Sequence, residues 1–230
     1  SVEFWTEDNT KRSDATLNVE SGLYEGSWGN PNNGEYKVKA VIVNGGSKKA
    51  ETPLATITVV KTVGFSEVGG FGSNPGNLRM WLYAPSNIVS KPGLVIALHG
   101  CSQNATSYAY DTEWNNRAST AGKFYVVYPE QKSSNNFQLC FTWFTKTFQQ
   151  RNYKENASIA QMIDYMVASY DVDPNKVYIT GFSAGACMSS VMLATYPEKF
   201  AGASLIAGIG YGEAVDVASA GLLMKNGKGT

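Results

Sequence analysis

One segment carries the residues of a nucleophilic active site: Gly181-Phe-Ser183-Ala-Gly185, which has the pattern G-x-S-x-G. A serine in this pattern occupies a sharp turn between a strand and a helix, where its hydroxyl is exposed and can attack a carbonyl carbon. The glycines leave room for the backbones that crowd past the turn, and the helix N-terminus favours a developing oxyanion. We therefore predict that Ser183 is the nucleophile of an acyl transfer. An ordinary glycine-rich turn is the alternative.

A second segment, Leu98-His99-Gly100-Cys101, is placed to complete an oxyanion hole. It ends the apolar run 93–98, which is typical of a parallel strand buried on both faces. In hydrolases of this kind one amide of the oxyanion hole comes from the loop after such a strand, and the other follows the nucleophile. We expect the amides of Cys101 and Ala184 to bind the carbonyl oxygen.

The chain contains one histidine, His99. It precedes Ser183, whereas the base of such a hydrolase follows its nucleophile in chain order. It also ends a buried strand, where an imidazole can brace the loop. We therefore expect a structural role for His99, with contact to the substrate and action as the base as the alternatives.

The elements that must position these residues are visible as patterns. Apolar runs predict strands over residues 78–84, 93–98, 124–128, 177–180 and 203–209. Apolar stripes predict helices over 111–121 and 184–195, and a third helix that Asn156 caps. Strands that alternate with helices in this way indicate an α/β fold with a mostly parallel sheet.

The N-terminal part has a different texture. Residues 36–42 and 55–59 alternate with period two, which predicts two strands that pair as a long-looped hairpin. Residues 15–19 can add a strand, and 29–34 are typical of a loop. Short strands at this spacing predict a small all-β, immunoglobulin- or fibronectin-like sandwich over residues 1–62, before an α/β domain over 63–230. A spacer or packing role is expected for it, with substrate binding as the alternative.

Composition excludes several classes of protein. Lys+Arg 19 against Asp+Glu 19 gives a formal net charge of +0, which argues against nucleic acid as a partner. No apolar run approaches the ~20 residues of a membrane helix, so no membrane contact is expected. One histidine and three scattered cysteines predict neither a metal site nor a disulfide scaffold. At most one bridge can form, and the residues leave open whether Cys140 pairs with Cys101 or Cys187.

Six segments, in order, resemble the esterase family of extracellular poly(3-hydroxybutyrate) depolymerases and its relatives, the feruloyl and acetylxylan esterases of carbohydrate esterase family one. They lie within residues 64–213 and comprise 71–78, 97–103, 128–131, 140–144, 181–185 and 192–197. The resemblance implies an α/β-hydrolase fold, secretion, no cofactor and cleavage of a polymer-linked ester through an acyl-enzyme. A hydroxyalkanoate polyester, feruloyl esters and acetyl esters on xylan all remain open as substrates.

Carried over by position, the resemblance implies that Ser183 is the nucleophile and that the Cys101 and Ala184 amides form the oxyanion hole. Trp143 and Phe144 would then lie near the acyl group, with core packing as their alternative role.

The family places its acid and its histidine after the nucleophile, beyond the stretch that follows Ser183 here. We therefore expect an incomplete hydrolase domain, whose acid and histidine lie on a removed or separate C-terminal segment. The polar residues 225–230 are typical of a loop open to nicking. The competing class is a catalytically inactive remnant that serves binding or structure.

Overall fold

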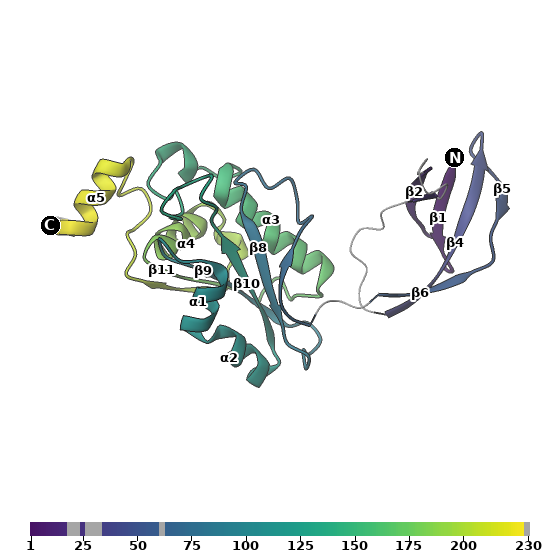
Figure 1. The fold of residues 1–230 in the computed structure, drawn as a ribbon, viewed down its shortest axis with the longest axis horizontal. Coiled ribbons are helices and arrows are strands. Elements are labelled where there is room, and N and C mark those ends of the chain that lie inside the picture. Colours follow the sequence, from purple (N-terminus) through teal and green to yellow (C-terminus); the bar gives the residue numbers. More distant parts are fainter. Residues whose placement is uncertain (18–23, 26–33, 60–62, 228–230) are drawn as a thin grey trace. The chain divides into compact units, whose positions relative to one another are not determined.

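The computed structural model describes residues 1–17, 24–25, 34–59 and 63–227 (Figure 1). It divides the chain into two compact units, Ser1–Lys61 and Thr62–Thr230. In the described residues the first unit holds strands alone, and in the second unit strands and helices alternate.

The described strands of the first unit form one antiparallel sheet. The two predicted strands pair as expected, with Tyr36 opposite Ile57, but the expected long loop between them contains a further strand, Ser47–Glu51, which the turn at residues 45–46 pairs with the first of the two. The strand expected over 15–19 begins and ends earlier, and residues 18–19 and 29–33 lie outside the described residues. The described strands of this unit lie in one sheet, so the two-sheet sandwich stays a prediction. The strands are β1 (Val2–Thr6), β2 (Lys11–Leu17), β3 (Tyr24–Glu25), β4 (Gly34–Asn44), β5 (Ser47–Glu51) and β6 (Ala55–Val59).

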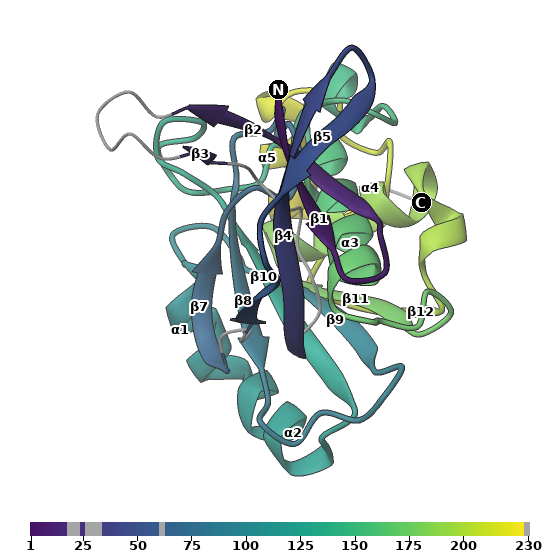
Figure 2. The same cartoon turned by 90° about the vertical axis from the view of Figure 1, so that its right-hand side faces the viewer.

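The second unit is built on a mixed, mostly parallel sheet with the strand order β12-β11-β9-β10-β8-β7 (Figure 2). The pairs β12–β11, β11–β9 and β9–β10 are parallel, and β8 and β7 add antiparallel pairs at one side. The predicted α/β class is therefore correct. The strands are β7 (Gly64–Val68), β8 (Arg79–Ala84), β9 (Gly93–Leu98), β10 (Phe124–Glu130), β11 (Val177–Phe182) and β12 (Gly202–Ile206).

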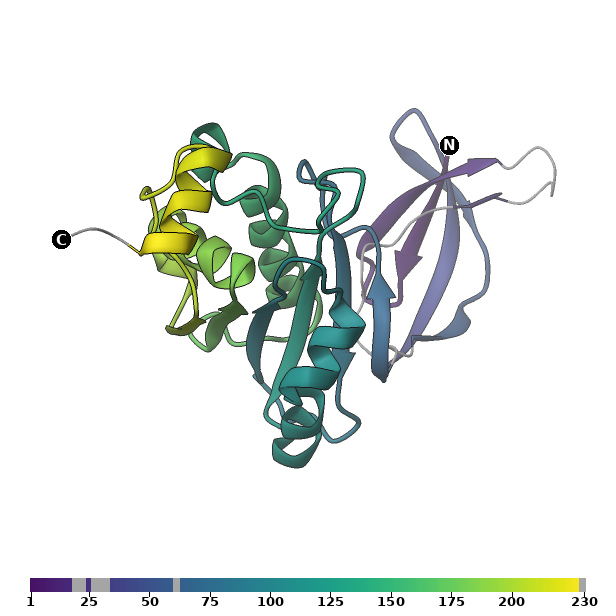
Figure 3. The ribbon, with the colours of Figure 1, turned by 60° about the vertical axis from the view of Figure 1, so that its left-hand side comes forward.

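Helices cover both faces of this sheet (Figure 3). Leu94, Ile96 and Leu98 of β9 join the core cluster that contains the apolar stripes of α3 and α4. Val95 and Ala97 face the opposite cluster, with α1 and α2. Burial on both faces explains why this strand is apolar at every position. The helices are α1 (Ala105–Thr112), α2 (Trp114–Ala121), α3 (Lys154–Ser169), α4 (Ala184–Thr195) and α5 (Val217–Asn226), with short 3-10 turns at Lys146–Gln149 and Pro197–Lys199.

Two helix predictions were wrong in detail. The helix expected over 111–121 is two helices, because Glu113 adopts a left-handed φ of 56° between them, and the first helix begins after an Asn104 capping box. Asn156 does not cap α3. It lies inside the helix, fully buried, and its side-chain amide donates to the carbonyl oxygen of Gln150.

The C-terminal elements also differ from expectation. The strand predicted over 203–209 ends at Ile206, because Ala207 has a positive φ of 54°. Residues 225–226, expected in a loop, are the last two residues of helix α5. β12 is an edge strand with apolar side chains in solvent: Leu205 is 40% exposed and Ile206 53%.

The turn between β11 and α4 is as tight as the G-x-S-x-G pattern predicts. Ser183 connects them with φ 52° and ψ −119°, a strained conformation for a residue with a side chain. A Cβ on Gly185 would lie 2.1 Å from the carbonyl oxygen of Leu98, and one on Gly181 would lie 2.4 Å from the carbonyl carbon of Gly185. Gly185 is therefore required for helix α4 to approach strand β9, and Gly181 for the first turn of α4 to pack on β11.

We expect Gly185→Ala to destabilise the protein by more than the ~1–3 kcal/mol typical of overpacking, because the added carbon meets backbone atoms that cannot rotate away. Chemical denaturation of the variant measures this loss. Gly221→Ala in α5 is the control, since nothing lies within 4 Å of its added carbon. Equal stability of the two variants would contradict this account of the turn.

Candidate functional site

The carboxyl ends of the parallel strands open onto one cavity of about 830 Å³. In open α/β sheets, ligands bind at this edge, where the loops after the strands meet. The cavity brings together the predicted Ser183, Ala184, Cys101, Trp143 and Phe144. Its other walls are segments that sequence reasoning did not assign: Ser102, Asn136–Gln138 and Cys140, residues 207–210 with Glu213, Cys187, and one side of α5.

Ser183 lies half-buried at this cavity. Its backbone amide donates to the carbonyl oxygen of Ile206 at 2.9 Å, which ties the turn to the end of β12. Its carbonyl accepts the amide of Cys187 at 3.0 Å, inside the first turn of α4. Since both backbone groups are held by neighbouring elements, the turn presents the side chain to the cavity from a fixed backbone.

The peptide bond between Gly100 and Cys101 is also fixed. The Gly100 amide donates to Gln103 Oε1 at 2.8 Å, and the Gly100 carbonyl oxygen lies 2.7 Å from His99 Nδ1. In a trans peptide the carbonyl and the following amide point in opposite directions, so the contact with His99 also orients the Cys101 N–H. Ala184 is the first residue of α4, whose initial amides have no acceptor inside the helix.

His99 itself is only 1% exposed and is not among the residues that line the cavity. Its Nε2 accepts the amide of Gln131 at 3.1 Å, so Nδ1 carries the proton and donates to Gly100. Burial, the main cause, lowers the pKa of the imidazole and keeps it neutral. Both ring nitrogens are engaged by backbone groups, and the ring lies outside the cavity lining. The structural role is the one that the geometry supports.

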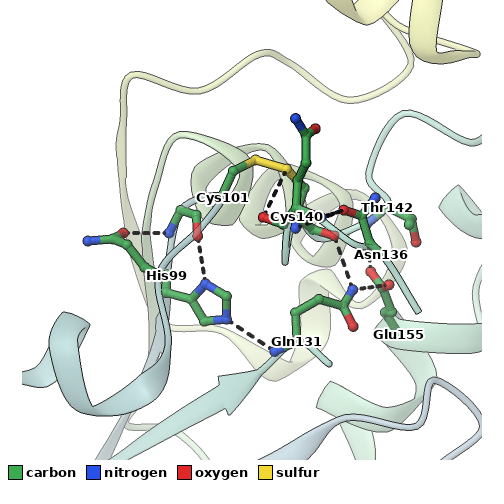
Figure 4. Close-up of a disulfide and its surroundings, with 10 residues drawn as sticks. His99, Cys101, Gln131, Asn136, Cys140, Thr142 and Glu155 are labelled. Atoms are coloured by element: carbon green, nitrogen blue, oxygen red, sulfur yellow. Dashed lines mark hydrogen bonds between the residues drawn. A yellow bond between two sulfur atoms is a disulfide. The ribbon is translucent and has the colours of Figure 1, made fainter. Parts of the chain in front are cut away.

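A disulfide links the loop after β9 to the loop after β10 (Figure 4). It joins Cys101 to Cys140, which answers the question that the sequence left open, and Cys187 remains free and buried. The amide of Ser102 donates to the carbonyl oxygen of Gln138 at 2.7 Å, beside the bridge. The two loops that flank the cavity are therefore connected covalently and by hydrogen bonding.

Trp143 and Phe144 form an aromatic wall of the cavity. Their rings meet edge to face, with centroids 5.6 Å apart. Trp143 is 4% exposed and belongs to the core cluster, while Phe144 is half-buried against it, so wall and core packing are both present. Gln149 Nε2 donates to the carbonyl oxygens of Trp143 and Ala214, both at 2.7 Å, and so connects this wall to the segment before α5.

Sequence reasoning missed Phe137, which is 85% exposed at the cavity, and it missed the helix α5. It also missed the buried pair Gln131 and Glu155 behind the aromatic wall. Polar residues at the end of an apolar strand and in the first turn of a helix were the available signal for that pair. Across the described part of the chain, no three His, Cys, Asp or Glu side chains are grouped to hold a metal ion. No helix in those residues has the length and apolar character needed to cross a membrane.

We expect the imidazole of His99 to remain the neutral Nδ1–H tautomer and to titrate below its usual value of about 6.5, because burial opposes its charge. The contribution of neutral His99 to the free energy of unfolding is present above pH 6.5. It is lost as the pH falls through the pKa that His99 has in the folded protein. Nitrogen-15 NMR measures both properties without assignment, because the chain has one histidine. A midpoint at or above 6.5, or an Nε2–H tautomer, would contradict the hydrogen bonds described here.

Residues 78–230 match the family model described as "Esterase PHB depolymerase". Poly(3-hydroxyalkanoate) depolymerase C of Paucimonas lemoignei is 48% identical over 162 residues, which are 70% of this chain and 39% of that protein. Feruloyl esterase B of Talaromyces funiculosus is 32% identical over 74% of this chain and 47% of its own length. The matched part is thus less than half of either relative.

Among solved structures, the acetyl xylan esterase from Aspergillus awamori is similar with a TM-score of 0.63 and 34% sequence identity. The likeness covers 67% of this chain and 56% of that one.

Proposed function

Because the chain belongs to the PHB depolymerase esterase family, we propose that it is the nucleophile-bearing part of a serine ester hydrolase that acts on polymer-linked esters. The observation that carries the proposal is the strained Ser183 between β11 and α4, at a cavity that Cys101 and Ala184 also line. This is the arrangement required for attack on a carbonyl with stabilisation of the resulting oxyanion.

In the proposed reaction, Ser183 Oγ bonds to the ester carbonyl carbon while its proton passes to a base. The carbonyl oxygen becomes an oxyanion and accepts hydrogen bonds from the two amides. The bond to the leaving alcohol then breaks, and the alcohol takes the proton from the base. Water repeats the attack on the acyl-enzyme, which releases the acid and restores the serine hydroxyl.

We propose that the base is supplied from outside these 230 residues, because both ring nitrogens of the one histidine bind backbone groups beside residues 99–103, the oxyanion loop. A C-terminal segment that carries the acid and the histidine is the proposed source. A serine without a base stays protonated and is a weak nucleophile. The competing function, a non-catalytic binding protein, applies if no such segment joins the chain.

The cavity favours an ester with an apolar acyl part. Trp143 and Phe144 form one wall, and Leu223 and Met224 of α5 contribute to another. Of the relatives, the one named a poly(3-hydroxyalkanoate) depolymerase is 48% identical and the one named a feruloyl esterase 32%. We therefore place a polyester first and a feruloyl or acetyl ester of plant polysaccharide second.

The Cys101–Cys140 disulfide supports secretion as part of the proposal. Structural disulfides persist in oxidising surroundings outside the cytosol and are rare within it. A polymer too large to enter a cell also requires an enzyme that acts outside it.

We expect the full-length protein to react with a fluorophosphonate at Ser183 alone, and Ser183→Ala to abolish that adduct and lower ester hydrolysis on the order of 10⁴-fold or more. Intact-mass and peptide mass spectrometry locate the adduct. Ser189→Ala is the matched control, since its hydroxyl on the same helix is buried and binds the Gly185 carbonyl oxygen. An adduct elsewhere refutes Ser183, and neither adduct nor turnover in the full-length protein favours the non-catalytic class.

We expect Phe137→Ala to reduce polymer hydrolysis by about tenfold, and by more than it reduces hydrolysis of p-nitrophenyl acetate, because loss of about 1.4 kcal/mol of apolar contact corresponds to that factor. Phe137 lines the cavity and is 85% exposed. Tyr110→Ala is the control: this ring is also 85% exposed but does not line the cavity. Equal losses on both substrates would show that Phe137 does not contact the polymer.

A further inference from the structure

A buried carboxylate lies behind the aromatic wall of the cavity and takes no part in the proposed reaction. Glu155, in the first turn of α3, is only 3% exposed. Its Oε1 accepts from Gln131 Nε2 at 2.5 Å, and its Oε2 accepts the backbone amide of Thr142 at 2.8 Å. Burial, the main cause, raises the pKa of this carboxyl, while both hydrogen bonds favour the charged form.

Gln131 connects Glu155 to the loops that follow β9 and β10. Its Nε2 also donates to the carbonyl oxygen of Cys140 at 3.1 Å, and its backbone amide donates to His99 Nε2. Its Oε1 accepts from the Lys132 amide and from Asn135 Nδ2, which fixes the orientation of the side-chain amide. Both the oxygen and the nitrogen of the Gln131 side-chain amide are therefore held by hydrogen bonds. Gln131 as a whole is 2% exposed.

These contacts close a ring, which can be followed in Figure 4. One route runs from Cys101 to Cys140 through the disulfide. The other runs from the Gly100–Cys101 peptide through His99 and Gln131 to the carbonyl oxygen of Cys140. Glu155 binds the Gln131 side chain of this second route. It also binds the backbone amide of Thr142, the residue before Trp143.

We infer that Glu155 is a positioning residue, whose buried carboxylate holds Gln131 and Thr142 so that the Cys101 amide and the Trp143 wall keep a fixed spacing across the cavity. The inference rests on the proposed ester hydrolysis at Ser183. Glu155 acts through these neighbours and does not touch the substrate.

The placement favours this role over fold stability alone. A buried charge is weak evidence for stability, because an apolar side chain of similar size often stabilises a core as well or better. Here one oxygen accepts from Gln131, whose backbone amide binds His99 at the end of β9, and the other accepts from Thr142, next to Trp143 of the aromatic wall. A misplacement of about 1 Å in such a site can lower a rate on the order of 100-fold.

Steady-state kinetics on the full-length protein with p-nitrophenyl esters test the role. Glu155→Gln keeps the shape but places an NH₂ group against one of the two donors. We expect it to lower kcat about tenfold with KM within about twofold, since the oxyanion contact strengthens in the transition state. Ser158→Ala is the matched control: this hydroxyl is buried in the same helix and binds the Gly76 amide, away from the cavity.

The control variant should lose thermal stability and keep both kinetic constants. Equal kcat in Glu155→Gln and wild type, or an equal loss in Ser158→Ala, would overturn the inference. If Glu155→Gln does not fold, Gln131→Met carries the same test, because it removes the link to Cys140 and keeps the backbone amide bound to His99.

Amide hydrogen exchange tests the ring without turnover, so its result is separate from the proposed function. We expect Glu155→Gln to speed exchange about tenfold at Thr142, which it binds, and also at Ser102, which it does not touch. Faster exchange at Thr142 alone would overturn the inference. If the wild-type protein hydrolyses no ester, the proposed function fails, and the Ser102 exchange still decides whether Glu155 positions the oxyanion loop.

Discussion

The close approach of helix α4 to the end of strand β9 is the constraint on which the site depends. There is room at Gly185 for a hydrogen and no more, since a Cβ would lie 2.1 Å from the Leu98 carbonyl oxygen. This contact places the start of α4 directly beside the loop that follows β9. Ser183 and Cys101 therefore line the same cavity from the ends of two strands that are neighbours in the sheet.

Beneath the cavity, the buried polar side chains bind backbone groups and the neutral side-chain amide of Gln131. His99 is neutral and bridges Gly100 to Gln131, while Glu155 accepts from Gln131 and the Thr142 amide. A buried polar group that lacks a partner costs about 1–3 kcal/mol, so each hydrogen bond restricts the loop it meets. The cavity wall is in this way held by groups that do not face it.

The strongest local patterns predicted the α/β class and the position of Ser183, because the buried run of β9 and the glycines at 181 and 185 each permit few structures. Patterns that depend on tertiary contact were less informative. Asn156 has the chemistry of a helix cap, yet it is buried within α3 because the helix begins earlier, at Lys154. The Cys101–Cys140 pairing and the Glu155 contacts join residues far apart in the chain, which local periodicity cannot report.

The edge strand β12 has a consequence for handling the chain. Its side chains over Gly202–Ile206 are largely exposed, and Leu205 and Ile206 are apolar. An exposed apolar edge offers unpaired amides and carbonyls as a template for another strand. When these 230 residues are prepared alone, we expect β12 to promote self-association and so to lower the solubility of the protein. A charged residue in place of Leu205 would reduce that tendency, because edge strands with inward or central charges resist intermolecular pairing.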